Sequence, residues 1–522
     1  MADNKLYYGD NLDILSRYVE DKSVDLVYLD PPFNSNQDYN VLFKERDGSR
    51  SAAQIKAFKD TWIWDQEASH AYQEMIEGDH EEVSKVLRAF HTFLGFNDML
   101  AYLSMMAPRL VELRRVLKDT GSIYLHCDPT ASHYLKMLMD AVFGPANFRN
   151  EIAWKRTPFA GSSKARARQF PASHDVILFY SRGDKHFFVG ERKDYEEDYY
   201  RRFKNPDNDP RGPYQSVLLK TYSQATFERL REEGKLIPAK SDGARWRYKQ
   251  FVSELKGRQV DDIWTDINMI NPVAKERLGY PTQKPEALLE RIINASSSEG
   301  DMVLDPFCGC GTTIAVAQRL NRRWIGIDVT CLAITLMRRR LESTFDGKAE
   351  FDVIGEPTAY SEAKQLAAEN PYQFQWWALD LVGARPVIEK KGADKGVDGR
   401  LLFHDDDSGE TKQVILSVKA GRLALSHVRD LRGVIEREHA EIGCLISLEE
   451  PTKNMREEAA EAGFYQHPLG KKMYPRLQLV TVKDLLEGKK LQLPESRVDV
   501  TFKKAPRTKA KQRAFTETDT NP

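Results

Sequence analysis

The most informative hydrophobic pattern in the chain is a short apolar run that stops at a carboxylate. Leu26 to Leu29 are apolar without alternation, and Asp30-Pro31-Pro32-Phe33 follows directly. A continuous apolar run of this length is typical of a strand buried on both faces of a parallel sheet. Because proline cannot donate to a β-ladder, the strand is expected to end at Asp30. The pattern therefore places Asp30 at the carboxyl edge of a sheet, where open α/β sheets bind ligands.

A second segment, 301–328, has the same strand-and-turn pattern and continues into a helix. Its strand ends at Asp305, its turn contains Gly309 and Gly311, a helix is predicted from about Thr312, and another strand ends at Asp328. In this βαβ arrangement the backbone approaches a nucleotide and the last acid takes ribose hydroxyls. The turn departs from Gly-x-Gly-x-x-Gly and has no basic residue that would meet a pyrophosphate. With Asp305 in front of it, the turn indicates a positively charged ligand, such as a sulfonium.

The rest of the pattern extends this fold class over most of the chain. Apolar residues at helical spacing predict helices over 97–117, 130–143 and 288–297, and 122–125 is predicted as a strand. We therefore predict a doubly wound, mostly parallel, Rossmann-like sheet with helices on both faces, followed by a smaller α/β unit. The predicted parts are a first domain over 1–345 with an irregular, turn-rich insert over 184–271, a linker over 346–369, a second domain over 370–490, and a basic tail over 491–522 that is expected to be disordered.

Composition adds little to this picture. The 522 residues are 41% hydrophobic and 30% charged with a net charge of −1, which is ordinary for a globular protein and indicates no particular partner. The five cysteines have no paired spacing beyond Cys308 and Cys310, so neither a disulfide framework nor a zinc site is predicted. Without a signal peptide or an apolar run of membrane-spanning length, a cytoplasmic location is expected and no membrane partner.

The residues around Asp30 match the needs of a heteroaromatic amine. The lone pair of such an amine is delocalised into its ring, and two acceptors, the Asp30 carboxylate and the Pro31 carbonyl, could bind both N–H groups and localise that lone pair toward a methyl donor. Phe33 could stack on an extruded base. A strand that simply ends in an Asp-Pro turn explains the same residues, and this stretch alone does not decide between the two interpretations.

With both segments, residues 5–340 resemble the amino-methylating DNA methyltransferases of the β arrangement, in which the catalytic motif precedes the cofactor motif. The resemblance rests on five motifs, at residues 30–33, 305–312, 281–285, 121–128 and 173–180. It implies S-adenosylmethionine as cofactor and favours adenine N6 over cytosine N4, because aspartate rather than serine precedes Pro-Pro. The implied catalytic residues are Asp30, Pro31, Pro32 and Phe33. The implied cofactor-binding residues are Asp10, Lys284, Asp305, Phe307, Gly309, Gly311, Thr312 and Asp328.

Double-stranded DNA is the expected partner, and local charge supports it. Basic residues cluster on a glycine- and serine-bearing stretch between Arg149 and Arg168, which suits phosphate contact better than a core, although a solvated loop explains it too. The candidate DNA contacts are Lys155, Arg156, Lys164, Arg166 and Arg168.

Trp62, Trp64 and Tyr72 are interpreted either as a lid over the site or as a satellite core. A homodimer is left open.

The second domain resembles the Mrr-like branch of the PD-(D/E)xK nucleases over about a hundred residues. Asp398 matches the metal-binding acid of that family and Lys419 its lysine, whereas Ser417 stands where the family has glutamate or glutamine. If the site holds a metal, Mg²⁺ at Asp398 is the candidate, but a hydroxyl is a poorer ligand than a carboxylate. Three functions therefore stay open: an adenine methyltransferase, a single-chain restriction and modification enzyme, and a non-catalytic DNA-binding protein.

Overall fold

The computed structural model describes two compact units, Met1–Phe187 with Thr265–Pro522 (unit 1) and Phe188–Trp264 (unit 2). The residues that it describes are 3–32, 37–44, 50–60, 63–157, 170, 172–238, 245–271, 274, 276–278, 280, 282–387, 396–405, 411–468, 472–494, 498–499 and 501. Among these residues, none of the helices is both long enough and apolar enough to cross a membrane.

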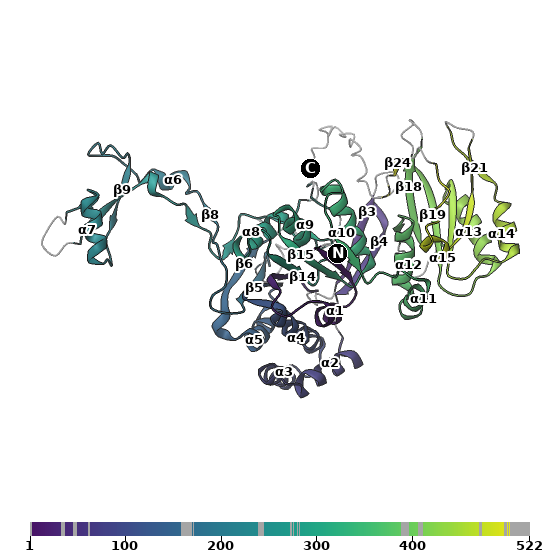
Figure 1. The fold of residues 1–522 in the computed structure, drawn as a ribbon, viewed down its shortest axis with the longest axis horizontal. Coiled ribbons are helices and arrows are strands. Elements are labelled where there is room, and N and C mark those ends of the chain that lie inside the picture. The colour runs from purple at the N-terminus through teal and green to yellow at the C-terminus, as the bar shows by residue number, and fades with distance from the viewer. Residues whose placement is uncertain are drawn as a thin grey trace, which may run out of the picture. The chain divides into compact units, whose positions relative to one another are not determined.

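Unit 1 is built on a mostly parallel sheet with the strand order β6-β7-β5-β2-β14-β15-β1-β16. From β5 to β16 all neighbours are parallel, and β6 and β7 add an antiparallel edge. Helices α1, α4 and α5 cover one face and α8, α9 and α10 the other (Figure 1). The predicted doubly wound fold class is confirmed. The strands are β1 (Lys5–Tyr8), β2 (Val24–Leu29), β5 (Leu117–Cys127), β6 (Phe148–Lys155), β7 (His174–Ser181), β14 (Met302–Asp305), β15 (Arg323–Asp328) and β16 (Asp352–Ile354).

The helices of this layer begin and end close to the positions that the sequence predicts. The helix predicted over 97–117 is α4, capped by the Asn97 side chain, and the one predicted from Thr312 is α9, which Gly311 begins in a left-handed conformation. A separate hairpin joins β3 (Gln37–Lys44) to β4 (Arg50–Asp60). The helices are α1 (Asn11–Tyr18), α2 (Gln66–Glu77), α3 (Glu81–Leu94), α4 (Asp98–Val116), α5 (Ser132–Phe143), α8 (Glu286–Ser296), α9 (Thr312–Arg319) and α10 (Cys331–Thr344).

Two aromatic residues that were candidates for a lid belong to the helical layer instead. Tyr72 is buried in the core cluster of α2 to α5, and Trp64 packs edge-on against it with ring centroids 5.8 Å apart. The satellite-core interpretation therefore describes Trp64 and Tyr72. Trp62 lies outside the described residues.

The C-terminal part of unit 1 is a second α/β layer, with the strand order β17-β18-β19-β20-β23. Alternate residues of β19 face opposite sides: Val414 and Leu416 pack toward α11 and α12, and Ile415 packs toward α13 and α14. The segment predicted as a linker contains β16 and α11. The elements are α11 (Tyr360–Glu369), α12 (Pro371–Leu381), β17 (Arg385–Pro386), β18 (Gly399–His404), β19 (Lys412–Lys419), α13 (Leu425–Arg437), β20 (Ile442–Ser447), α14 (Lys453–Ala460), β21 (Phe464–Gln466), β22 (Met473–Pro475), β23 (Leu477–Thr481), α15 (Val482–Leu486) and β24 (Val498–Asp499).

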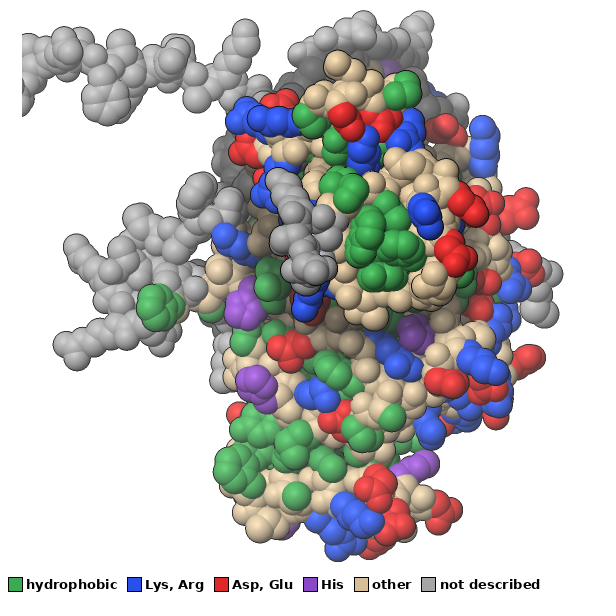
Figure 2. Space-filling model, turned by 90° about the vertical axis from the view of Figure 1, so that its left-hand side faces the viewer, with side chains coloured by type: hydrophobic (Ala, Val, Ile, Leu, Met, Phe, Trp, Pro, Cys, Tyr) green, Lys and Arg blue, Asp and Glu red, His purple; other side chains and the backbone are tan. Residues whose placement is uncertain are grey.

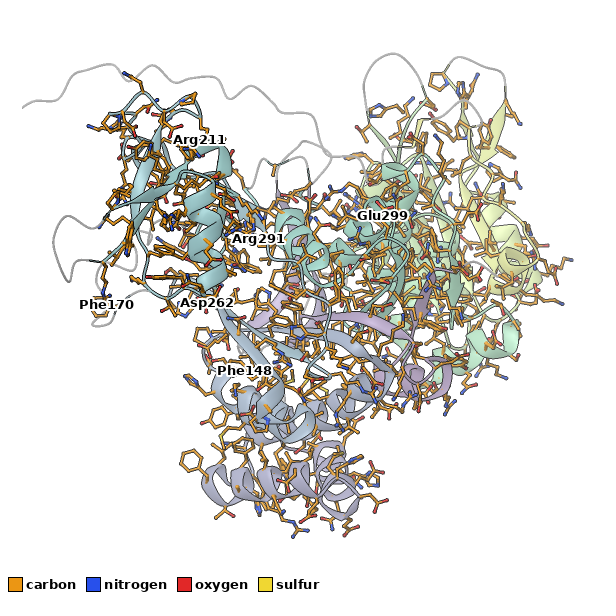
Figure 3. All side chains as sticks on the ribbon, turned by 60° about the vertical axis from the view of Figure 1, so that its left-hand side comes forward. Phe148, Phe170, Arg211, Asp262, Arg291 and Glu299 are labelled. Carbon is orange, nitrogen blue, oxygen red and sulfur yellow. The ribbon has the colours of Figure 1, made fainter. Side chains whose placement is uncertain are left out.

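Unit 2 lies within the predicted insert and has a small antiparallel sheet, β10-β11-β9. Charged hydrogen bonds connect the turn before β9 to β11: the Asp209 carboxylate accepts from Arg211 Nε at 2.9 Å and from Lys249 Nζ at 2.8 Å. Arg211 is labelled in Figure 3. The elements are β8 (Arg192–Lys193), α6 (Glu197–Tyr200), β9 (Tyr214–Leu218), α7 (Gln224–Glu232), β10 (Leu236–Ile237), β11 (Arg247–Phe251), β12 (Arg258–Gln259) and β13 (Ile263–Trp264).

Candidate active site

The two strand tips that the sequence singles out are neighbours in the sheet. β2 pairs with β14 in parallel, with Leu26 opposite Val303 and Val27 opposite Leu304. β14 pairs with β15, which in turn pairs with β1. Parallel strands end at the same edge, so the acids at the carboxyl ends of these four strands meet there. They surround one cavity of about 250 Å³, whose lining includes Asp10, Asp30, Asp305 and Asp328.

The glycine turn brings backbone close to this cavity. Gly309 and Gly311 have φ values of +50° and +72°, which disfavour other residues. At Gly311 a Cβ atom would lie 2.5 Å from Met337 Cγ, so a side chain there has no room. Asp328 Oδ2 accepts from Gly309 N at 2.9 Å, which ties the turn to the end of β15. Of the other predicted cofactor residues, Phe307 and Thr312 also line the cavity.

Two carboxyl groups in the cavity have raised pKa values. Burial raises the pKa of Asp305 to about 7, and the nearby Asp30 and Asp328 carboxylates add to the shift. Burial also raises the pKa of Asp328, against hydrogen bonds from Thr330 and Gly309. Carboxyl groups that are costly to ionise in the free protein are a mark of functional sites, because a bound cation offsets that cost. Both acids were predicted from the sequence as cofactor-binding residues.

Asp10 is the N-cap of α1 and also lines the cavity. Its Oδ1 accepts from Leu12 N at 2.8 Å, and its Oδ2 accepts from Arg109 Nη2 at 2.6 Å. Arg109 Nε also donates to Asn11 Oδ1 at 2.6 Å, and Asn11 Nδ2 donates to Pro306 O at 2.8 Å. Arg109 of α4 therefore joins the loop after β1 to the loop after β14.

At the tip of β2, Asp30 is held by a lysine from a distant part of the chain. Its Oδ2 accepts from Lys284 Nζ in an ion pair whose side chains are 14% and 11% exposed. Its Oδ1 is buried and has no hydrogen-bond partner among the described residues. A buried carboxylate oxygen without a donor costs free energy unless a ligand supplies one. Asp30 and Lys284 both line the cavity, so Asp30 offers one oxygen for an incoming N–H group.

A buried polar chain leads from the cavity to the base of the basic segment. The Tyr28 hydroxyl lies 2.9 Å from His126 Nδ1, and His126 Nε2 lies 3.2 Å from Asp175 Oδ2. Burial and the nearby Lys284 cation lower the pKa of His126. A neutral His126 therefore accepts from Tyr28 and donates to Asp175, and Asp175 Oδ1 pairs with Arg156 Nε at 3.2 Å.

The predicted DNA contacts are described only in part. Lys155 ends β6, and Arg156 is anchored by Asp175. Lys164, Arg166 and Arg168 lie outside the described residues, as does Phe33. Phe170, which follows the basic segment, is 98% exposed (Figure 3). Figure 2 shows basic and acidic side chains intermingled on the face in view, which agrees with the net charge of −1.

Three residues of this site were missed by sequence reasoning, although two of them carry a local signal. Tyr28 stands two positions before Asp30 in a strand, so both side chains are expected on the same face. Arg109 interrupts a buried helix of apolar residues, which indicates a specific partner. His126 lies within a motif that supports the family resemblance, but its partners come from other strands, so no local pattern reveals its role.

In the C-terminal layer, Asp398 is surrounded by hydrogen-bond donors. Its Oδ1 accepts from Gln375 Nε2 at 2.9 Å, and its Oδ2 accepts from Ser417 Oγ at 3.0 Å and from Val418 N at 2.6 Å. Lys419 Nζ lies 3.7 Å from Oδ2. Among the described residues no group of three acidic, histidine or cysteine side chains is placed to hold a metal ion. The arrangement does not fit the Mg²⁺ ion suggested by the sequence, because donors occupy the positions that a cation needs.

The substitution Asp398→Ala is therefore expected to destabilise this layer without affecting a metal. It removes the acceptor of Gln375, Ser417 and Val418, and each buried group left unpaired costs about 1–3 kcal/mol. We expect a lower melting temperature for the variant and no effect of millimolar Mg²⁺ on that of the wild type, measured by calorimetry. Stabilisation of the wild type by Mg²⁺, absent in the variant, would contradict this interpretation.

Comparison with known proteins agrees with the geometry. A family model described as DNA methylase matches residues 24–335, and one described as NACHT-associated inactive restriction endonuclease matches residues 372–487. The type II methyltransferase M.EcaI of Enterobacter cloacae is 27% identical over 362 residues, covering 64% of this chain and 69% of that protein. The type II methyltransferase M.HpaI of Haemophilus parainfluenzae is 27% identical over 338 residues, covering 65% and 73%.

One solved structure with a similar fold is described as a DNA modification methylase of Thermus thermophilus in complex with S-adenosyl-L-methionine. Its sequence is 18% identical and its TM-score is 0.35. The match covers 68% of this chain and 100% of that one. The DNA methylase model covers more than half of the 522 residues. The chain therefore belongs to the N6/N4 DNA methylase family and is a DNA methyltransferase.

Proposed function

We propose that the protein transfers a methyl group from S-adenosylmethionine to the exocyclic N6 of adenine in double-stranded DNA. The observation that carries the proposal is the Asp30 carboxylate, which has one oxygen paired with Lys284 and one buried oxygen without a partner among the described residues. An amino N–H group is the donor that this oxygen lacks. Aspartate at this position, in the resemblance stated above, favours adenine over cytosine.

The residues around the cavity fit the cofactor. S-adenosylmethionine supplies, when bound, a methyl group on a positively charged sulfur. Asp305, whose pKa burial raises to about 7, offers a carboxylate to that charge. Asp328 lies at the end of β15, where such folds bind ribose hydroxyls. Gly309 lines the cavity, and a Cβ atom there would lie 3.2 Å from the ring of Tyr280, another lining residue, so the absent side chain lets backbone and ring form the same wall.

Asp30 and Pro31 then act on the base. Methyl transfer to the amine would leave a positive charge and a surplus proton on the amine nitrogen. In this proposal the Asp30 carboxylate accepts that proton, and the Pro31 carbonyl, from the residue after Asp30, is a second acceptor for the amine. Lys284 keeps the other carboxylate oxygen fixed. The base must leave the duplex to reach this cavity, at a cost of about a few kcal/mol.

DNA would be held by the basic segment and by unit 2. Lys155 and Arg156, with Lys164, Arg166 and Arg168, are proposed to contact phosphates, which positions the duplex without reading its sequence. Unit 2, within the insert over 184–271, is proposed to carry target recognition. A phosphate contact by Arg156 would connect through Asp175 and His126 to Tyr28 in the cavity.

Product analysis tests the proposal. Duplexes that contain every short sequence context are incubated with methyl-labelled cofactor, digested and separated as nucleosides. We expect the label in N6-methyladenine. Label in N4-methylcytosine would overturn the choice of base, and the absence of label in DNA would overturn DNA methylation by this site.

The pair Lys284–Asp30 gives a separate prediction. Lys284→Met leaves a buried carboxylate without its cation, so we expect turnover to fall about 100-fold, with partial recovery in Lys284→Arg. Lys118→Met is the matched control, because Lys118 Nζ pairs with Asp25 at 2.7 Å at the other end of the same strand. Both Met variants should lower the melting temperature. Equal turnover in the two would contradict a role for Lys284 at Asp30.

A further inference from the structure

The cofactor cavity and the C-terminal layer share one apolar cluster. Tyr280 and Cys310 line the cavity, and Cys331 and Leu332 begin the helix that follows Asp328. All four belong to a single cluster of buried residues with α11 and α12 of the C-terminal layer, including Phe374, Trp376 and Trp377. Domains joined by a linker normally move relative to each other unless their interface is large and apolar. This interface is apolar and reaches the cavity wall.

A hydrogen bond extends the contact to the cofactor loop. Cys331 N is the first N–H of α10, and it donates to Gln373 Oε1 of α12 at 3.2 Å. Two neighbouring donors are satisfied within the turn itself: Asp328 Oδ1 accepts from Thr330 N at 2.8 Å, and the Thr330 hydroxyl accepts from Ala333 N. Free N–H groups at a helix start need an acceptor. For Cys331 the C-terminal layer provides it.

An ion pair fixes the same two helices farther along. Arg338 Nη1 of α10 donates to Asp380 Oδ2 of α12 at 3.2 Å, and Arg338 Nη2 donates to Glu356 at 2.7 Å. Both ends of the α10–α12 contact are therefore held by polar bonds, with apolar side chains between them. The loop that contains Val329 and Thr330, both lining the cavity, begins this helix.

We propose that the C-terminal layer, although it resembles a nuclease, serves as the outer wall of the cofactor site, and that Gln373 is a positioning residue for the Asp328–Cys331 loop. The layer then contributes to cofactor affinity and not to the transfer step. Helix α12 also offers a matched control, because Gln375, two positions farther on, contacts Asp398 and not the cofactor loop.

Cofactor affinity and amide exchange of the full-length chain test this role. In Gln373→Ala we expect S-adenosylmethionine to bind about fivefold more weakly by calorimetry, the loss typical of one net hydrogen bond. The Cys331 amide should exchange faster without any cofactor present, and kcat at saturating cofactor should stay within about twofold, because only uniform binding is lost. Gln373→Glu keeps an acceptor oxygen and should bind the cofactor nearly as the wild type does.

The control separates this role from general destabilisation. Gln375→Ala should leave both the cofactor dissociation constant and Cys331 exchange unchanged, even if it lowers the melting temperature. Equal weakening in Gln373→Ala and Gln375→Ala, or unchanged affinity in Gln373→Ala, would overturn the proposal, and so would a Gln373→Glu variant as weak as Gln373→Ala. Because binding and exchange need no DNA, these outcomes do not depend on which base is methylated.

Discussion

Asp305→Asn is expected to weaken S-adenosylmethionine binding on the order of 100-fold, because a cation bound in the cavity would lose the attraction of a buried carboxylate. The same change should stabilise the cofactor-free protein at pH 8. The ordinary pKa of an aspartate is near 3.8, and burial raises that of Asp305 to about 7. As the pH rises from about 4 to 7, the unfolded chain loses a proton that the folded protein keeps. The contribution of Asp305 to the free energy of unfolding therefore falls between these two pH values. Above pH 7 the folded protein bears the whole cost of the buried charge, at most roughly 4 kcal/mol.

Two measurements check this prediction. The melting temperature of Asp305→Asn should exceed that of the wild type by more at pH 8 than at pH 5. In calorimetry the wild type should bind S-adenosylmethionine more tightly as the pH rises through about 7, up to about tenfold per unit on the acid side. S-adenosylhomocysteine, which lacks the sulfonium charge, should show much less of this dependence. A pH-independent affinity for S-adenosylmethionine would contradict the placement of Asp305 beside the charged sulfur.

Asp30→Asn is expected to reduce methyl transfer about 10³-fold or more while both ligands still bind. An amide keeps the size of the side chain, but it offers one acceptor and cannot take the amine proton. Asp25→Asn is the matched control, since Asp25 lies in the same strand and pairs with Lys118 away from the cavity. Single-turnover transfer from preformed complexes gives the rate, and titrations give the two dissociation constants. A loss of DNA binding equal to the loss of rate would mean that Asp30 holds DNA rather than acting on the amine.

The sequence predicts those parts of the fold that depend on residues close together in the chain. The apolar run before Asp30 and the glycine turn after Asp305 fix two strand ends, and parallel packing then brings those ends to one edge. β2 and β14 are indeed neighbours. Asp10, Asp305 and Asp328 were expected at the cofactor site, and all three line the cavity.

The contacts that sequence did not predict join residues far apart in the chain. Lys284 was expected to contact the cofactor, and its pairing with Asp30, 254 residues earlier, follows from no local spacing. The packing of α12 on α10 was missed for the same reason: Phe374, Trp376 and Trp377 indicate burial but not what they are buried against. Ser417 is the opposite case. Its departure from the nuclease pattern signalled a changed site, and its hydroxyl donates to Asp398 where a metal would need a ligand.

Sequencing of modified bases in single DNA molecules, from cells that express the wild type or Asp30→Asn, tests the central claim most directly, because it reports base, position and context together. We predict N6-methyladenine at one short sequence context with the wild-type protein and none with the variant. The same modification pattern in both strains, or no modified adenine in either, would contradict the account of a base amine held at Asp30 beside a cofactor at Asp305.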